Sequence, residues 1–259
     1  MKAKKSLGQN WLKSASAIKE IIKAGELKPG ELVLEIGPGR GALTKALLSQ
    51  GVKVLAVEKD DFLIKDLQEK FGSEIKAGKL ILIHQDISDF NVEKGLKTLD
   101  KGKYKLIANI PYYITGQIIR QFLSQTTNQP NLMVLMVQKE VAKRIVASDK
   151  KESILSISTK AYGEPKYIKT VPAGAFDPRP KVDSAILQIK DITRNKLKNT
   201  KEEEFFNLVK KGFGQKRKML KGNLTLSDQI LNACNIEIKA RAEDLTLENW
   251  LCLTSKIKN

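Results

Sequence analysis

Apolar side chains alternate along this chain between helical spacing and short continuous runs. Residues 15–24 have helical spacing, so a helix is predicted there with Gly25 as its stop. Short apolar runs then predict strands at 31–36, 52–57, 80–83, 105–108, 132–137, 167–171 and 185–189. Helical spacing between the runs predicts helices at 42–50, 62–71, 114–124 and 139–147. This alternation predicts an α/β fold with a parallel sheet covered by helices on both faces.

The pattern changes after residue 190, where strand signals stop. The next thirty residues are polar and cation-rich, and weaker helical patterns resume around Phe205, Gln229 and Trp250. Residues 194–221 carry ten Lys or Arg against three Glu. We therefore predict a large α/β domain over residues 1–190 and a small basic helical domain over residues 191–259, with the small domain suited to a polyanion.

Charge strengthens the case for a nucleic-acid partner. Lys and Arg total 46 against 29 acidic residues in 259, a formal net charge of +17. Such a field attracts polyanions, although a merely solubilising basic surface has the same composition. The basic N-terminus lacks the apolar core of a signal peptide, and no run of about 20 apolar residues occurs. A cytoplasmic protein without a membrane partner is expected.

Cysteine and histidine are too few for several kinds of site. Cys234 and Cys252 are the only cysteines, so we expect neither a disulfide framework nor a four-cysteine zinc site, which fits a reducing compartment. His84 is the only histidine and adjoins an apolar run, so we interpret it as structural. A Ser-His-Asp hydrolase or a histidine-based metal site is therefore not expected.

A glycine turn between a predicted strand and a predicted helix is the first candidate ligand site. Gly37, Gly39 and Ala42 satisfy the relaxed dinucleotide pattern G-x-G-x-x-A, and Glu58 ends the next strand, where a carboxylate can bind ribose hydroxyls. A nicotinamide dehydrogenase is therefore one alternative. The G-K-[ST] ending of a phosphate-binding P-loop is absent.

Polar residues at strand ends favour S-adenosylmethionine over a dinucleotide. Glu35 puts a carboxylate beside the turn, which suits the ammonium group of a methionine moiety better than a pyrophosphate. Asp86 follows the third strand and can accept from an adenine amine, and Asn109 closes the fourth. The carboxyl ends of successive strands in an open α/β sheet converge on one crevice, so these groups are predicted to meet.

The tetrapeptide Asn109-Ile110-Pro111-Tyr112 indicates chemistry on an exocyclic amine. Such an amine is a poor nucleophile, because its lone pair is delocalised into the ring. Asn109 Oδ1 and a main-chain carbonyl that accept its hydrogens would favour the pyramidal nitrogen of the transition state. Pro111 fixes the turn, and Tyr112 offers a face on which a flipped-out base can stack. An ordinary strand-to-loop turn is the alternative.

Together these motifs resemble the KsgA/RsmA family of ribosomal RNA adenine N6-dimethyltransferases, which shares motifs with the Erm resistance methyltransferases. The resemblance covers nearly the whole chain and rests on residues 8–12, 35–41, 58, 85–86, 109–113 and 176–185. Residues 213–220 and 223–224 are more similar to the housekeeping small-subunit enzymes than to the resistance enzymes. Trp11 stands where the family usually has phenylalanine, and Tyr113 where asparagine or histidine is common.

The resemblance implies a Rossmann-like methyltransferase fold with a small C-terminal helical domain, and it implies site residues. The implied S-adenosylmethionine site comprises Asn10, Leu12, Gly37, Gly39, Glu58, Asp86 and Asn109. The implied target-base site comprises Asn109, Ile110, Pro111, Tyr112 and Phe176. Lys216, Arg217 and Lys218, interpreted as one side of a helix, would hold RNA through its phosphates, with a solvated helix face as the alternative.

The implied reaction is two successive methyl transfers to N6 of adjacent adenosines in the 3′-terminal hairpin loop of 16S rRNA, within an immature 30S subunit. A monomeric enzyme is expected. No histidine or metal is needed, because the sulfonium is already a good leaving group. Two alternatives stay open beside the dehydrogenase: an Erm-like enzyme acting on large-subunit rRNA, and an assembly factor that binds rRNA without catalysis.

Overall fold

The computed structural model describes residues 8–97 and 103–257, which divide into two compact units. The first comprises the described residues of Met1–Ala142 together with Lys166–Ile192, and the second comprises Lys143–Pro165 and Thr193–Asn259. The boundary expected at residue 190 assigns residues 143–165 to the large domain, whereas their contacts join them to the helical unit. Glu152 N, for example, donates to Glu243 O at 2.7 Å.

A seven-stranded sheet forms the centre of the first unit, with the order β4-β3-β2-β5-β6-β9-β7. Its strands are β2 (Leu32–Ile36), β3 (Lys53–Glu58), β4 (Leu80–His84), β5 (Tyr104–Asn109), β6 (Leu132–Gln138), β7 (Glu164–Val171) and β9 (Ser184–Lys190). The strands β2 to β6 run parallel. β9 runs antiparallel to β6, so the expectation of a wholly parallel sheet is wrong at this edge. An apolar run buried on both faces looks the same in either direction.

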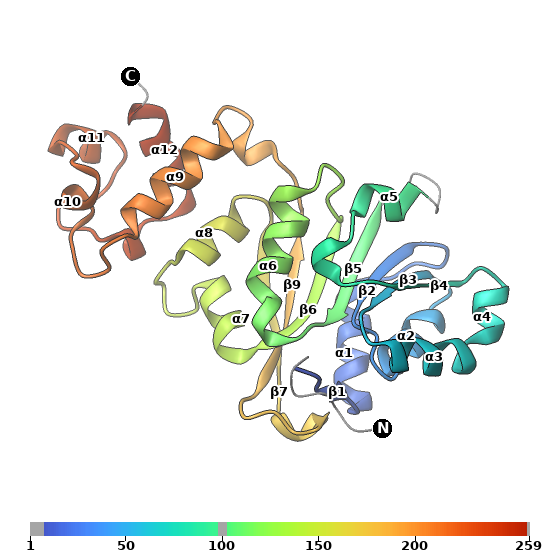
Figure 1. Ribbon diagram of the computed structural model, residues 1–259. Coiled ribbons are helices and arrows are strands. Elements are labelled where there is room, and N and C mark those ends of the chain that lie inside the picture. The colour runs from blue at the N-terminus through green and yellow to red at the C-terminus, as the bar shows by residue number, and fades with distance from the viewer. Residues whose placement is uncertain (1–7, 98–102, 258–259) are drawn as a thin grey trace. The chain divides into compact units, whose positions relative to one another are not determined.

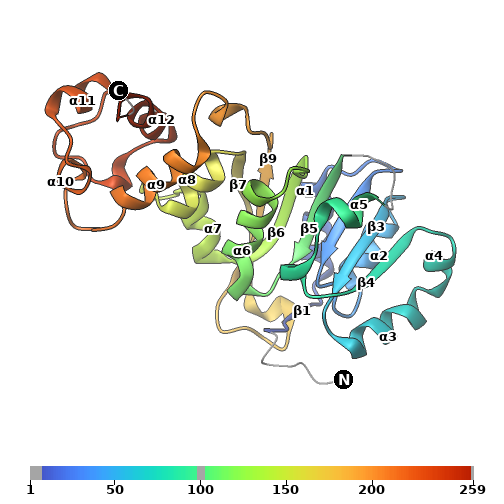
Figure 2. The same ribbon diagram turned by 45° about the horizontal axis from the view of Figure 1, so that its top comes forward.

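Helices cover both faces of this sheet, with α1 and α2 on one face and α5 and α6 on the other (Figures 1 and 2). The helices are α1 (Ala15–Gly25), α2 (Ala42–Leu48), α3 (Asp61–Lys70), α4 (Gly72–Lys76), α5 (Val92–Lys97), α6 (Thr115–Arg120) and α7 (Lys139–Val146). Local signals begin two of them, because Ser14 Oγ accepts from Ala17 N at 3.3 Å and Asp60 Oδ1 accepts from Phe62 N at 3.1 Å.

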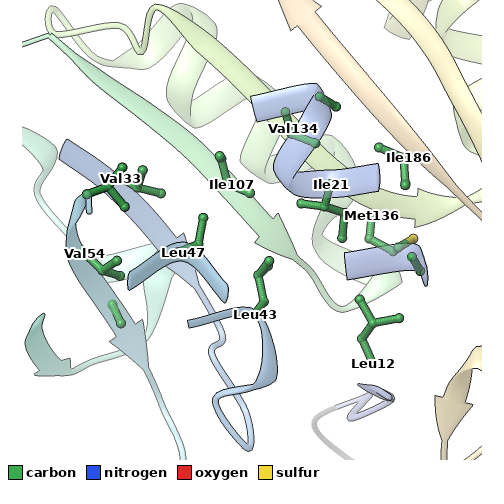
Figure 3. Close-up of a cluster of buried hydrophobic side chains, with 14 of the residues drawn as sticks. Leu12, Ile21, Val33, Leu43, Leu47, Val54, Ile107, Val134, Met136 and Ile186 are labelled. Carbon is green, nitrogen blue, oxygen red and sulfur yellow. The ribbon is translucent and has the colours of Figure 1, made fainter. Parts of the chain in front are cut away.

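The main core lies between the strands and the helices α1 and α2 (Figure 3). Alternate strand residues such as Val33, Ile107 and Val134 point toward Ile21 of α1 and Leu47 of α2, and all five side chains are fully buried. Period-two alternation places their sequence neighbours on the opposite face. The central strands β2, β3, β5 and β6 are buried along nearly their whole length and are mostly apolar, which is why their positions could be predicted closely.

A short N-terminal strand crosses the end of the core. The strand β1 (Trp11–Leu12) pairs antiparallel with β8 (Phe176–Asp177), with Leu12 opposite Phe176. Lys13 N donates to Ala175 O at 2.9 Å, and the side chain of Leu12 is buried in the core. This pairing fixes residues 8–12 over the carboxyl end of the sheet.

The second unit is helical. Its helices are α8 (Ile154–Lys160), α9 (Glu202–Gly212), α10 (Leu220–Leu224), α11 (Asp228–Ala233) and α12 (Leu247–Ile257). Phe205 and Trp250 are fully buried, and the Phe213 ring stacks on Trp250 at 5.7 Å. The patterns expected around Phe205, Gln229 and Trp250 correspond to α9, α11 and α12. No helix in residues 8–97 and 103–257 combines the length and apolar character needed to cross a bilayer.

A disulfide joins the residue that follows α11 to α12. The sulfur atoms of Cys234 and Cys252 are 2.06 Å apart, and the two residues are 18 positions apart in the sequence. A single disulfide agrees with the expectation that the chain has no network of disulfides. Because the two cysteines are bonded, however, they no longer argue for a reducing compartment. The spacing alone did not show that the end of α11 would meet this face of α12.

We predict that reducing this bond destabilises the helical unit by about 2–3 kcal/mol, because a closed loop of this length restricts the unfolded chain. Urea unfolding with and without reductant, followed by the fluorescence of Trp250 in a Trp11→Phe background, measures the difference. The control carries Cys234→Ala and Cys252→Ala and should not respond to reductant. Equal unfolding midpoints with and without reductant would contradict the prediction.

Candidate active site

A cavity of about 230 Å³ opens at the carboxyl ends of β2, β3 and β5 and beside the end of β4. The strand order reverses between β2 and β5, and a ligand crevice is expected at such a reversal. Most of the predicted site residues line it: Asn10, Gly37, Gly39, Glu58, Asp86, Asn109, Ile110, Pro111 and Tyr112. Residues 8–12, the glycine turn and residues 109–113 are thus brought together.

The glycine turn after β2 is held by main-chain bonds and needs a left-handed backbone. Gly37 has φ +63° and donates from its N–H to Val57 O at 2.9 Å. Gly39 has φ +58°, and a Cβ there would lie 2.7 Å from Trp11 Cδ1. A Cβ on Gly37 would meet no atom within 4 Å. The turn therefore presents bare backbone to the cavity, as a closely bound ligand requires.

Glu58 ends β3 with its carboxylate nearly buried. Oε1 accepts from Lys59 N at 2.9 Å and Asp60 N at 3.0 Å, and Oε2 accepts from Gly39 N at 3.2 Å. Burial raises the pKa of Glu58, and these N–H donors oppose that rise. The bond to Gly39 ties the strand end to the glycine turn, so Glu58 shapes the turn as well as facing the cavity.

Asp86 follows β4 at the rim of the cavity. Its Oδ1 accepts from Ser88 N and Ser88 Oγ, and its Oδ2 lies 2.5 Å from Lys59 Nζ. The hydrogen bonds from Lys59 and Ser88 lower the pKa of Asp86 to about 2. Asp86 is therefore a carboxylate at neutral pH, which suits an acceptor for an amine hydrogen.

Asn109, the last residue of β5, contacts the N-terminal segment. Its Nδ2 donates to the main-chain oxygen of Asn10 at 3.0 Å. This bond fixes the orientation of the amide, so Oδ1 is the end that remains to accept a hydrogen at the cavity. The side chain of Ile110 is buried, and Pro111 O accepts from Ile114 N at 3.2 Å. The four-residue motif is thus a rigid turn that presents one amide oxygen.

Tyr112 is half-buried and its hydroxyl is bound. Tyr112 Oη and Ser184 Oγ are 2.6 Å apart, and Ser184 on β9 is fully buried. Burial raises the pKa of Tyr112, so the phenol is neutral at physiological pH. Tyr113 lines the same cavity but is 67% exposed, and its ring packs against Gly8. The fixed ring of Tyr112 can bound a flat ligand, and Tyr113 stands at the mouth.

Two predicted site residues do not line this cavity. Phe176 is 1% exposed and lies in the core, paired with Leu12 across β1 and β8. Leu12 is also buried and borders only a neighbouring cavity of about 30 Å³. Phe176 therefore packs in the core next to the N-terminal strand β1, and its buried ring cannot stack on a base in this conformation.

Glu35 and Trp11 border the small cavity, and neither is among the site residues that the family resemblance implies. Glu35 on β2 is 1% exposed, and burial raises the pKa of its carboxyl to about 8. Glu35 Oε2 and Trp11 Nε1 are both buried without a hydrogen-bond partner. Buried polar atoms are usually paired, so two such atoms beside one cavity mark a polar subsite. The position of Glu35 just before the glycines indicated a contact with the ligand. Nothing in the sequence indicated a ligand contact for Trp11.

Other lining residues had weak or no sequence signals. Lys59 and Ser88 bind Asp86, and Gln9 Nε2 donates to Asp60 Oδ2 at 2.9 Å, which links the N-terminal segment to α3. The buried Ser184 lies 72 positions from the tyrosine that it holds, so only the fold brings them together. No cluster of three or more His, Cys, Asp or Glu suited to a metal ion occurs within the described ranges.

The predicted basic cluster is exposed but not helical. Lys216, Arg217 and Lys218 lie in a turn between α9 and α10. Asn223 Nδ2 shapes this turn by donating to Gly212 O at 2.7 Å and Gln215 O at 3.2 Å. The expected helical face is therefore wrong, because the helix ends before the cluster and the three cations project from a bonded loop.

The strand order, the glycine turn and the polar strand ends define the Rossmann-like fold of S-adenosylmethionine-dependent methyltransferases. The structure of a dimethyladenosine transferase from Plasmodium falciparum matches with a TM-score of 0.78, over 95% of this chain and 97% of that one, at 24% identity. The 23S rRNA methyltransferase ErmE matches with a TM-score of 0.76, over 96% and 100% of the two chains, at 23% identity. Both confirm the predicted fold.

The chain belongs to the ribosomal RNA adenine dimethylase family, whose model matches residues 1–259. A relative from Dehalococcoides mccartyi, a ribosomal RNA small subunit methyltransferase A, is 43% identical over 98% of this chain and 88% of its own length. The family predicted from the motifs is thus confirmed, and the protein is a methyltransferase of this family. Membership also removes the basis for the dehydrogenase alternative.

We predict that Glu35→Gln stabilises the protein at alkaline pH. The folded-state pKa of Glu35 is raised from 4.5 to about 8, so the folded state retains a proton that the unfolded state loses. Stability of the unmodified protein should therefore fall as pH rises from about 4.5 to about 8, by about 2–5 kcal/mol, and the variant lacks this loss.

Urea unfolding without ligand at pH 5 and pH 8.5 measures this effect. The two proteins should have similar stability at pH 5, and the variant should be the more stable at pH 8.5. A difference between them that does not change with pH would contradict burial of a titrating carboxyl at this position.

Proposed function

We propose that this protein binds S-adenosylmethionine in the cavity and dimethylates N6 of two adjacent adenosines in the 3′-terminal hairpin loop of 16S rRNA, in an immature 30S subunit. The observation that carries the proposal is the Asn109 amide, which lines the cavity and whose Nδ2 is held by Asn10 O, leaving Oδ1 as the acceptor. The name of the relative from Dehalococcoides mccartyi supports a small-subunit substrate.

The residues present fit the cofactor. The positive φ of Gly37 and the open space above it provide the bare backbone that a sulfonium nucleoside can lie against. Glu58 would accept from ribose hydroxyls, and Asp86 from the adenine amine, because both present carboxylate oxygens at successive strand ends. The unpaired Glu35 Oε2 suits the ammonium of the methionine end. When bound, the cofactor supplies an electrophilic methyl on a good leaving group.

The protein's own groups would orient and polarise the amine. Asn109 Oδ1 and a neighbouring main-chain carbonyl in residues 109–111 would accept the two N6 hydrogens and favour a pyramidal nitrogen. The Tyr112 ring, fixed by Ser184, would stack on the flipped base, a contact worth about 1–3 kcal/mol. We assign stacking to Tyr112 rather than to the buried Phe176. Methyl transfer forms the N–C bond, breaks the C–S bond and releases one N6 proton to solvent.

The basic turn of the helical unit would hold RNA through its phosphates. Lys216, Arg217 and Lys218 are all exposed and can contact phosphates without reading sequence. A 16S rRNA substrate supports a cytoplasmic location.

We predict that Asn109→Leu lowers kcat by about 10²–10³-fold, because it removes the acceptor oxygen while keeping the side-chain size. The matched control is Asn131→Leu, which alters an exposed asparagine just before β6. The measurement is transfer of labelled methyl groups to immature small subunits. Turnover within about 10-fold of the unmodified enzyme would contradict the proposed role, since loss of a transition-state acceptor costs more than that.

Substrate choice is predicted to favour immature small subunits over naked large-subunit rRNA. Labelled methyl groups should appear as N6,N6-dimethyladenosine at two adjacent positions near the 3′ end of 16S rRNA, detected by mass spectrometry of nuclease digests. Labelling confined to large-subunit rRNA would identify an Erm-like enzyme instead. Binding of small subunits without any labelling would identify an assembly factor.

A further inference from the structure

The small cavity behind the glycine turn adjoins the large one. Trp11, Gly37, Gly39 and Asn109 line both, and Glu35 lines only the small one. Its volume of about 30 Å³ is enough for one small polar group. A ligand in the large cavity can therefore extend one end past the glycine turn to Glu35.

The two buried polar atoms at this cavity are complementary in kind. Trp11 Nε1 can only donate a hydrogen bond, whereas Glu35 Oε2 as a carboxylate can only accept one. Neither atom has a hydrogen-bond partner among residues 8–97 and 103–257, although the Thr44 hydroxyl interacts with the Glu35 carboxyl. Leaving both unpaired is unfavourable, and a group carrying both an acceptor and a donor would satisfy them together.

Trp11 is held by a contact over its ring and by a contact along its nitrogen edge. The Arg40 guanidinium lies 4.0 Å from the ring centroid. On the glycine turn, the position that a Cβ of Gly39 would occupy is 2.7 Å from Trp11 Cδ1 and 3.1 Å from Nε1. The nitrogen edge of the indole therefore faces bare backbone at the boundary between the cavities, with the Arg40 guanidinium over the ring and the buried Glu35 carboxyl lining the small cavity.

We propose that Trp11 Nε1 donates a hydrogen bond to the carboxylate of the cofactor's methionine end, while Glu35 accepts from its ammonium. This inference rests on the proposed function, because it assumes S-adenosylmethionine in the large cavity. The zwitterion matches the donor and the acceptor, and its ammonium would favour the ionised form of Glu35 once bound. Trp11 is then a residue that recognises the amino-acid portion of the cofactor, in addition to packing on the glycine turn.

The test compares two ligands that differ in the amino-acid end. S-Adenosylhomocysteine carries the ammonium and carboxylate, whereas 5′-methylthioadenosine has the same nucleoside and sulfur without them. Isothermal titration calorimetry should show that Trp11→Phe weakens binding of S-adenosylhomocysteine by about 10–100-fold, as expected for loss of a hydrogen bond to a charged group. The same substitution should weaken binding of 5′-methylthioadenosine by less than about 2-fold.

Two further variants control the comparison. Trp250 is the other tryptophan, and its Nε1 is also buried without a partner, so Trp250→Phe makes the same chemical change in the helical unit and should alter neither affinity. Glu35→Gln should weaken the binding of S-adenosylhomocysteine but not that of 5′-methylthioadenosine. This variant tests the same subsite, and we expect it to fold because the substitution removes a buried titrating group.

Equal weakening of both ligands by Trp11→Phe would overturn the inference, because the indole would then act through packing alone. Unchanged affinity for both would also overturn it and would indicate a buried water as the partner of Nε1. If the unmodified protein bound neither ligand, the proposed function itself would fail. The two kinds of failure are therefore distinguishable.

Discussion

The hydrogen bond from Asn109 Nδ2 to the main-chain oxygen of Asn10 is the interaction on which the site depends. It joins the end of a central strand to an N-terminal segment 99 residues earlier, and it decides which end of the amide faces the cavity. The segment can make this bond because β1 pairs with β8 and Leu12 is buried in the core. Packing far from the reaction thereby fixes the orientation of one oxygen.

Charge is divided between the cavity and the rest of the chain in a way that matches two different ligands. Glu58 and Asp86 line the large cavity and Glu35 lines the small one, so three acidic side chains gather at the site, although the whole chain carries a net charge of +17. Carboxylates suit the cationic and hydroxyl groups of a sulfonium nucleoside, whereas the exposed cations around Arg217 suit RNA phosphates. One chain can thus attract a polyanion without repelling a cationic cofactor.

Much of the fold followed from sequence because the central strands are buried and mostly apolar, so that Gly37, Glu58 and Asn109 at or just after the strand ends stand out against them. The missed features depend on long-range packing. The direction of β9 and the link between Cys234 and Cys252 leave no trace in local periodicity. The burial of Phe176 arises from its pairing with β1, which only the folded chain brings opposite it.

The most direct test of the central claim is a crystal structure with S-adenosylhomocysteine and a short RNA that presents the target adenosine. Asn109 Oδ1 should lie within about 3.2 Å of N6, with the base stacked on Tyr112 and N6 facing the sulfur. An N6 held by other groups, or an Asn109 amide turned so that Nδ2 faces the base, would contradict the account.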